Sequence, residues 1–366
     1  RLREALDIAR RRADILITTG GLGPTYDDLT KQTICAAFDQ PLVLHPDILE
    51  EIRVFYESAL HVPMPENNAQ QAMLPQGCTV FDNPVGTAPG CAFSCNGVHV
   101  LMLPGPPHEM ETMLRRCAIP YLRRLSQEVI VSRDIMTFGM GESSVDQLLH
   151  ETMSHMENPT LATYAKPCEV RLRATAKAAD TAQAEAMLVP VVEQVRTALG
   201  DIVYGIDVEN LESVCLSLLK ERHLTLATAE SCTGGLVAQR ITALPGASAV
   251  FRGGVVSYWT EIKAAVLGVP QEILDQYGAV SEQTARAMAQ GARRITGADL
   301  AVSVTGVAGP DPDERGTPVG IVYIGLDTPT GTFCRKMDSG RRRRDRIRGL
   351  AANHAFDVLR RYLTGL

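Results

Sequence analysis

The chain has 366 residues, of which 45% are hydrophobic and 21% charged, and this length predicts two or three globular domains. Its formal net charge of −6 argues against nucleic acid as the main partner, because phosphate binding requires an excess of lysine and arginine. No apolar run is long enough to span a bilayer, so no membrane partner is expected. No signal peptide is evident, and the nine cysteines lack zinc-ligand spacing. These features predict a cytoplasmic protein with reduced thiols.

The first part of the chain, residues 1–125, repeats a unit of strand, loop and helix. Residues 14–19 form a strand pattern that leads into a glycine-rich loop and then into a helical pattern at residues 29–38. A second strand, residues 97–103, runs into a proline- and glycine-rich loop and a helix at residues 109–122. Such units predict a doubly wound α/β sheet that binds its ligand at the loops following the strands.

The glycine-rich loop of residues 20–28 is the candidate phosphate-binding segment of this domain. It differs from a Walker P-loop, because no lysine and hydroxyl follow the glycines at the required spacing. Asp27 and Asp28 stand where a helix begins, and two roles stay open for them: helix capping, or coordination of a divalent cation that bridges bound phosphates. The residues expected to contact a nucleotide phosphate are Gly20, Gly21, Gly23, Thr25 and Gly105.

Residues 126–207 mix short strands and helices and predict a small α+β module that links two larger domains. The segment Gly-Met-Gly-Glu-Ser at residues 139–143 is interpreted as a turn that caps a helix. The expected strands are residues 129–138, 160–164 and 169–175, and the expected helices are residues 143–153 and 180–199.

The third part, residues 208–366, is organised around one strand, turn and helix. Residues 224–228 alternate apolar and polar side chains as a strand does, and Ser-Cys-Thr-Gly-Gly at residues 231–235 forms a tight polar turn before a helix. The first backbone N–H groups of that helix are expected to be free to hold an anion or an oxyanion. Ser231 is therefore either a nucleophile beside these donors or simply the cap of the helix.

The rest of this part predicts the strands and helices that complete a three-layer α/β domain. The expected elements are strands at residues 250–258 and 299–304, a hairpin of residues 319–326 and 332–337, and helices at residues 260–267, after Ser281, and at the carboxy terminus.

Three motifs of the first part resemble the competence/damage-inducible protein CinA family: Gly-Gly-Leu-Gly-Pro-Thr-x-Asp-Asp, Asn-Pro-Val-Gly-Thr-Ala-Pro-Gly and Leu-Pro-Gly-x-Pro-x-Glu-Met. Ala-Glu-Ser-Cys-Thr-Gly-Gly at residues 229–235 is highly specific to the carboxy-terminal domain of the same family. The resemblance implies a molybdopterin-binding-like first domain, here without the strand and helix that usually open it. It also implies that residues 208–366 are a nicotinamide-nucleotide amidohydrolase domain.

The activity that this resemblance implies is deamidation of nicotinamide mononucleotide (NMN) to nicotinic acid mononucleotide and ammonia, without a cofactor. Ser231 would be the nucleophile and Lys263 the general base, since a lysine whose pKa is lowered by burial can take a proton from a serine hydroxyl. Tyr258 would either orient this pair or be a packed strand residue. The residues expected to bind the substrate are Thr233, Gly234, Gly235, Ser248, Thr305, Gly306, Gly309 and Arg344.

Three positions depart from the family pattern. Thr260 replaces an asparagine, Thr317 replaces a lysine, and an arginine-rich run at residues 341–346 replaces a Gly-Asp-Arg motif. Within this run, Arg344 is the best counterpart of the family's arginine. The run is interpreted either as a solvated segment or as a phosphate-binding one, because arginines at the start of a helix oppose its macrodipole.

Two alternative functions stay open at this point. The first domain could be a metal-dependent ADP-ribose pyrophosphatase, as the family implies, with Asp27 or Asp28 holding the cation. The chain could instead be a non-enzymatic nucleotide-binding protein in DNA uptake or repair, as the family name suggests. The expected partners are small nucleotides, NMN or ADP-ribose, and the expected assembly is a homodimer.

Overall fold

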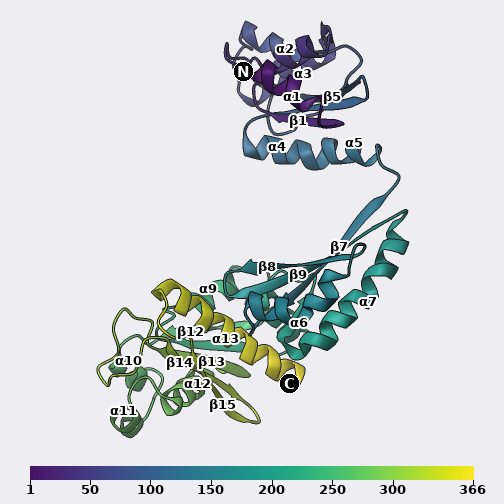
Figure 1. Ribbon diagram of the computed structural model, residues 1–366. Coiled ribbons are helices and arrows are strands. Elements are labelled where there is room, and N and C mark those ends of the chain that lie inside the picture. The colour runs from purple at the N-terminus through teal and green to yellow at the C-terminus, as the bar shows by residue number, and fades with distance from the viewer. The chain divides into compact units, whose positions relative to one another are not determined.

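The computed structural model describes residues 1–366 and divides them into two compact units, residues 1–127 and 128–366 (Figure 1). The second unit contains a small antiparallel module followed by a larger α/β domain. No helix of the structure is both long and apolar enough to cross a membrane. All nine cysteines carry free thiols.

The first unit is built on a mixed four-stranded sheet in the order β1-β6-β5-β4. Strand β1 (Ile15–Thr19) pairs parallel with β6 (Val98–Leu103), whereas β5 (Gly90–Cys95) and β4 (Thr79–Phe81) join in antiparallel fashion. A two-stranded ladder, β2 (Leu42–Leu44) with β3 (Met73–Pro75), lies beside it. The helices of this unit are α1 (Leu2–Ala9), α2 (Thr30–Ala37), α3 (Pro46–Ala59), α4 (Pro107–Met113) and α5 (Ile119–Arg123).

Helices cover both faces of this sheet. Successive side chains of a strand point to opposite faces, and those of β6 are buried on both. Val100 and Met102 of β6 belong to the core beneath α1, α2 and α3. Leu101 and Leu103 of the same strand belong to a second core, with Met113 of α4. The arrangement agrees with the predicted α/β class.

The helix expected at residues 109–122 is interrupted. A π-helical turn, Leu114–Ala118, separates α4 from α5, and Pro120 lies in the first turn of α5. Because proline has no N–H to donate to the carbonyl four residues earlier, the regular hydrogen-bond ladder cannot continue through this position.

The second unit begins with a four-stranded antiparallel sheet in the order β10-β7-β9-β8. In β9, Val170, Leu172, Ala174 and Ala176 are buried at every second position, and they pack against two helices. The longer helix is capped by Asp180, whose carboxylate accepts a hydrogen bond from the Gln183 N–H at 2.8 Å. The elements are β7 (Val129–Thr137), α6 (Glu142–Ser154), β8 (Thr160–Lys166), β9 (Glu169–Ala178), α7 (Thr181–Leu199) and β10 (Val203–Ile206).

The following domain has a five-stranded sheet in the order β12-β11-β13-β14-β15. Strands β12 (Phe251–Val256), β11 (Leu226–Glu230) and β13 (Leu300–Gly306) are parallel. The hairpin of β14 (Ile321–Thr328) and β15 (Gly331–Asp338) adds two antiparallel strands. Every residue of β11 is buried, as expected for a strand between two others and beneath two helical layers.

Two helical layers complete this domain. The first contains α8 (Leu211–Glu221), α9 (Leu236–Thr242) and the long α13 (Arg344–Thr364), and the second contains α10 (Thr260–Ala265), α11 (Gln271–Tyr277) and α12 (Glu282–Thr296). The core of the first layer also includes Phe138 and Tyr204 of the antiparallel module. This shared core is the reason that residues 128–366 form one unit.

Candidate active site

The turn between β11 and α9 lies at the C-terminal edge of the parallel strands, where α/β sheets bind their ligands. The Ser231 N–H donates to the Val304 carbonyl of the neighbouring β13 at 2.9 Å, and the Gly234 N–H closes the turn on the Ser231 carbonyl at 3.0 Å. Gly234 and Gly235 both have positive φ values, of 60° and 93°, which side chains with a Cβ rarely adopt. The two glycines therefore allow the chain to reverse sharply and leave Ser231 at the end of the strand.

Lys263 reaches this serine from α10. Its Nζ donates to the Ser231 Oγ at 3.0 Å and to the Ser257 carbonyl at 2.6 Å, and the side chain is only 1% exposed. Burial lowers the lysine pKa to about 8 from its ordinary value of 10.5, because the charged form loses its hydration. A neutral amine is therefore accessible close to neutral pH, at hydrogen-bond distance from a hydroxyl.

Two arginines of α13 hold the loops around this pair. Arg344 donates to the Tyr258 hydroxyl at 2.6 Å and to the Gly309 carbonyl at 2.5 Å. One helical turn later, Arg348 donates to the Thr233 carbonyl at 2.6 Å. The start of the last helix is thus tied to three segments that surround Ser231.

The expectation that the first N–H groups of α9 are free to bind an oxyanion is wrong. The carboxylate of Glu230 accepts hydrogen bonds from the Val237 N–H at 3.0 Å and the Ala238 N–H at 2.8 Å. The N–H groups of the turn itself differ, since those of Thr233 and Gly235 donate to no acceptor within the protein. These turn amides are the backbone donors that remain for an anion.

The structure brings most of the predicted substrate-binding residues to this edge of the sheet. Thr305 and Gly306 end β13 beside Ser231, and the Thr305 hydroxyl donates to the Ala279 carbonyl at 2.7 Å. Ser248 is not part of the cluster. It is exposed on a 3₁₀ turn that precedes β12, at the opposite end of the parallel strands, and the length of β11 alone separates the two ends by about 13 Å.

Three participants were not predicted from the sequence: Glu230, Arg348 and the carbonyl of Ser257. A sequence signal exists for Glu230, because an acidic residue ends an otherwise uncharged buried strand. A signal also exists for Arg348, which follows Arg344 by four residues and so shares its helix face. A backbone carbonyl leaves no such signal.

In the first unit, the predicted phosphate loop contains two glycines in a backbone conformation that other residues rarely adopt. Gly20 and Gly21 have positive φ values of 87° and 72°, and Gly105 packs against Gly20 with no side chain between them. The Thr25 Oγ1 lies 2.6 Å from a carboxylate oxygen of Asp27 and of Asp28, so its one proton is donated to either, and the Thr25 N–H donates to Asp28 at 2.9 Å.

The two carboxylates therefore converge on one turn. No group of three or more histidine, cysteine, aspartate or glutamate side chains is arranged to hold a metal ion. A cation at Asp27 and Asp28 would need further oxygens from bound phosphates, which is the manner in which Mg²⁺ is usually held by proteins.

Comparison with known proteins identifies three successive domains. Residues 1–124 match a probable molybdopterin binding domain, residues 132–205 a damage-inducible protein CinA KH domain, and residues 208–363 the CinA C-terminal domain. Over 366 residues the chain is 44% identical to a putative competence-damage inducible protein of Acetivibrio thermocellus, covering 100% of this chain and 88% of that protein. The chain belongs to the CinA family.

A second relative supports this membership. A CinA-like protein of Kosmotoga olearia is 43% identical over 366 residues, again covering 100% of this chain and 88% of that protein. The crystal structure of competence/damage inducible protein CihA from Agrobacterium tumefaciens is 38% identical, covers 42% of this chain and 93% of its own, and aligns with a TM-score of 0.41. The Ser231 turn lies within the CinA C-terminal domain, and the antiparallel module contains the CinA KH domain.

Proposed function

We propose that the CinA C-terminal domain of this chain hydrolyses the carboxamide of NMN, giving nicotinic acid mononucleotide and ammonia. The observation that carries the proposal is the contact between the Lys263 Nζ and the Ser231 Oγ, made by a buried amine whose pKa is lowered to about 8. A hydroxyl becomes a useful nucleophile when an adjacent base removes its proton, and a neutral lysine can do so.

The proposed reaction is acyl transfer in two halves. The Ser231 Oγ attacks the carboxamide carbon while its proton passes to the Lys263 Nζ, and the Thr233 and Gly235 amides are the candidate donors to the resulting oxyanion. Lys263 then returns the proton to the departing nitrogen, and ammonia leaves. Water attacks the acyl-enzyme with Lys263 again as base, which releases the carboxylate and restores the serine.

The substrate phosphate would be met by arginines at the start of α13. Arg343 and Arg344 are exposed there, and Arg344 already touches the Tyr258 hydroxyl. Guanidinium groups suit phosphate because they donate two parallel hydrogen bonds. The same exposure supports the phosphate-binding alternative for Arg343 and Arg344 of this arginine-rich run.

The first test is ammonia release from NMN by the purified chain and by Ser231→Ala. Removal of the nucleophile should lower kcat by at least about a thousandfold with little change in stability. The matched control is Ser281→Ala, which removes another buried hydroxyl, one that caps α12 through the Thr284 N–H. The control should lose some stability and keep its turnover. A Ser231→Ala variant with more than about a tenth of the activity would contradict the proposal.

A second candidate activity belongs to the first unit, and the convergence of Asp27 and Asp28 on the Thr25 hydroxyl favours it. We infer a metal-dependent hydrolysis of ADP-ribose at the Gly20–Gly21 loop, where a bound divalent cation would neutralise phosphate charge. Asp27 and Asp28 would hold the cation, and backbone amides of the loop would bind the diphosphate. ADP-ribose hydrolysis that persists in Asp27→Asn/Asp28→Asn would count against this assignment.

A further inference from the structure

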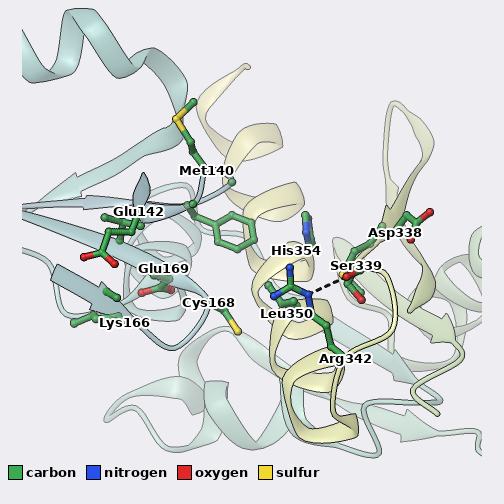
Figure 2. Close-up of a pocket in the computed structure, with 16 residues that line it drawn as sticks. Met140, Glu142, Lys166, Cys168, Glu169, Asp338, Ser339, Arg342, Leu350 and His354 are labelled. Carbon is green, nitrogen blue, oxygen red and sulfur yellow. Dashed lines mark hydrogen bonds between the residues drawn. The ribbon is translucent and has the colours of Figure 1, made fainter. Parts of the chain in front are cut away.

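A cavity of about 400 Å³ lies within the second unit, away from the Ser231 turn. One wall comes from the antiparallel module, through the loop between β7 and α6 and the turn between β8 and β9. The other wall comes from the loop between β15 and α13 and from α13 itself. Figure 2 shows the two walls facing each other, with His354 and Leu350 on α13 and Lys166, Cys168 and Glu169 on the module.

The inner part of this cavity is apolar and aromatic. Phe138, Met140 and Leu350 line it, and the Phe138 and His354 rings meet edge to face with their centroids 5.0 Å apart. Burial lowers the His354 pKa to about 4, so the imidazole is neutral at physiological pH. Its Nδ1 is buried and has no hydrogen-bond partner in the protein. The Phe138 ring is only 3% exposed, so the half-buried Leu350 supplies the accessible apolar surface beside a neutral polar ring.

Two cations reach the mouth of the cavity from opposite walls. Lys166 comes from the end of β8 and forms no ion pair in the structure, and Arg342 comes from the β15–α13 loop. The Arg342 Nε donates to the Ser339 carbonyl at 2.9 Å, which leaves both terminal amino groups of the guanidinium free. In Figure 2 this guanidinium extends into the space between the walls.

Three acidic residues also line the cavity, and two of them are already engaged. The Glu169 carboxylate accepts from the Tyr204 hydroxyl at 3.0 Å and from Asn353 at 3.3 Å. Asp338 accepts from the Gly340 N–H at 3.0 Å. Glu142 is exposed and makes no hydrogen bond within the protein. Because these donors are neutral, the charges of Glu169 and Asp338 remain, and three carboxylates, of which only Glu142 makes no hydrogen bond, accompany the two free cations.

We propose that this cavity binds a nucleoside monophosphate. Its volume is in the range of small-molecule sites, which are mainly apolar with a few polar groups that orient the ligand. The phosphate would lie between Lys166 and Arg342, and the base would pack on Leu350 beside His354. Glu142 would accept hydrogen bonds from the ribose hydroxyls, a role that a carboxylate has in other nucleotide sites.

Cys168 gives a local readout of this binding. Its half-buried thiol lines the cavity, whereas Cys334, also half-buried and in the same unit, does not. The experiment measures the rate at which N-ethylmaleimide alkylates each cysteine of the full chain, by peptide mass spectrometry, with increasing adenosine monophosphate (AMP). AMP has no carboxamide, so the result is independent of the proposed deamidation. Saturable protection of Cys168 by at least about fivefold, with Cys334 unchanged, is the expected result.

Charge-reversal variants assign the phosphate contact. In the Arg342→Glu and Lys166→Glu variants, the AMP concentration required to protect Cys168 should be at least tenfold higher than in the wild type. The matched control is Arg341→Glu, an exposed neighbour in the same loop that does not line the cavity and should behave as the wild type.

Three results would overturn the proposal: an unchanged Cys168 rate at millimolar AMP, equal effects of the Arg341 and Arg342 changes, or adenosine protecting as well as AMP. The last result would exclude the phosphate contact. The second would show that the loop acts through its overall charge rather than through a built site.

Discussion

At the scale of single residues, the unusual feature is a lysine that is 1% exposed and meets only a hydroxyl and a carbonyl. No carboxylate pairs with it, so burial dominates and its pKa falls to about 8. The Cys232 thiol of the same turn is not a competing base, because burial raises its pKa to about 12. Lys263 is therefore the group of this turn that titrates near neutral pH.

This assignment predicts the pH dependence of catalysis. Only the neutral lysine can accept the serine proton, so kcat/KM for NMN should rise about tenfold per pH unit below pH 8 and level off above it. The profile should be recorded from pH 6 to pH 9.5 in buffers of constant ionic strength. A flat profile across this range would mean that Lys263 does not act as the base.

The charge of Lys263 also predicts an effect on stability. The pKa of Lys263 is about 8 in the folded state and near 10.5 in the unfolded state. Burying the ammonium therefore lowers the free energy of unfolding, and this cost applies in full below pH 8. This cost disappears as the pH rises from 8 to 10.5. Lys263→Met should therefore be more stable than the wild type at pH 7, by at most about 3 kcal/mol, and the difference should shrink by pH 10.

Stability should be followed by hydrogen exchange of peptides from residues 128–366, because the chain's single tryptophan, Trp259, is 72% exposed and its fluorescence would change little on unfolding. Lys263→Arg is the matched variant, because it keeps a charge that cannot be lost. Lys263→Arg should be nearly as inactive as Lys263→Met, and it should be less stable than Lys263→Met at every pH. An active Lys263→Arg variant would show that only a positive charge is needed at this position.

At the scale of elements, α13 positions the Ser231 turn through Arg348, which donates to the Thr233 carbonyl. Arg348→Leu should lower kcat about tenfold or more with a smaller change in KM, because the turn loses a charge-assisted hydrogen bond that holds its geometry. Arg348→Lys should recover part of the rate. The control is Arg346→Leu, an exposed change on the same helix, which should stay within twofold of the wild type. Equal losses in both leucine variants would contradict the positioning role.

At the scale of the whole molecule, the two proposed activities belong to different compact units, residues 1–127 and 128–366. The Ser231 mechanism uses only side chains and backbone amides, whereas the inferred ADP-ribose hydrolysis needs a divalent cation. A chelator should therefore abolish ADP-ribose hydrolysis and leave NMN deamidation within about twofold. Both reactions should be followed in one preparation of the full chain. Deamidation that is lost with the chelator and restored by added Mg²⁺ would contradict the proposal that only ADP-ribose hydrolysis needs a divalent cation.

The sequence by itself determined the features that depend on near neighbours in the chain. The alternation from residue 224 to residue 228 predicted a strand, and the glycines at 234 and 235 predicted the turn that follows. The hairpin of β14 and β15 and the α/β class also follow from local pattern, because side-chain period and turn residues act over a few positions. Lys263 was assigned through the family motif, since nothing in its own segment indicates a base.

Only the tertiary structure decided which groups meet. Parallel pairing of β11 with β12 brings the C-terminal ends of both strands together, so that Lys263 reaches Ser231 across 32 positions, while the same register leaves Ser248 at the opposite edge. Side-chain contacts also decided that Glu230, rather than a ligand, occupies the first amides of α9. The cavity that Phe138 and His354 line exists because two modules share one core. Such contacts depend on strand order and on packing between distant segments, which local sequence pattern does not encode.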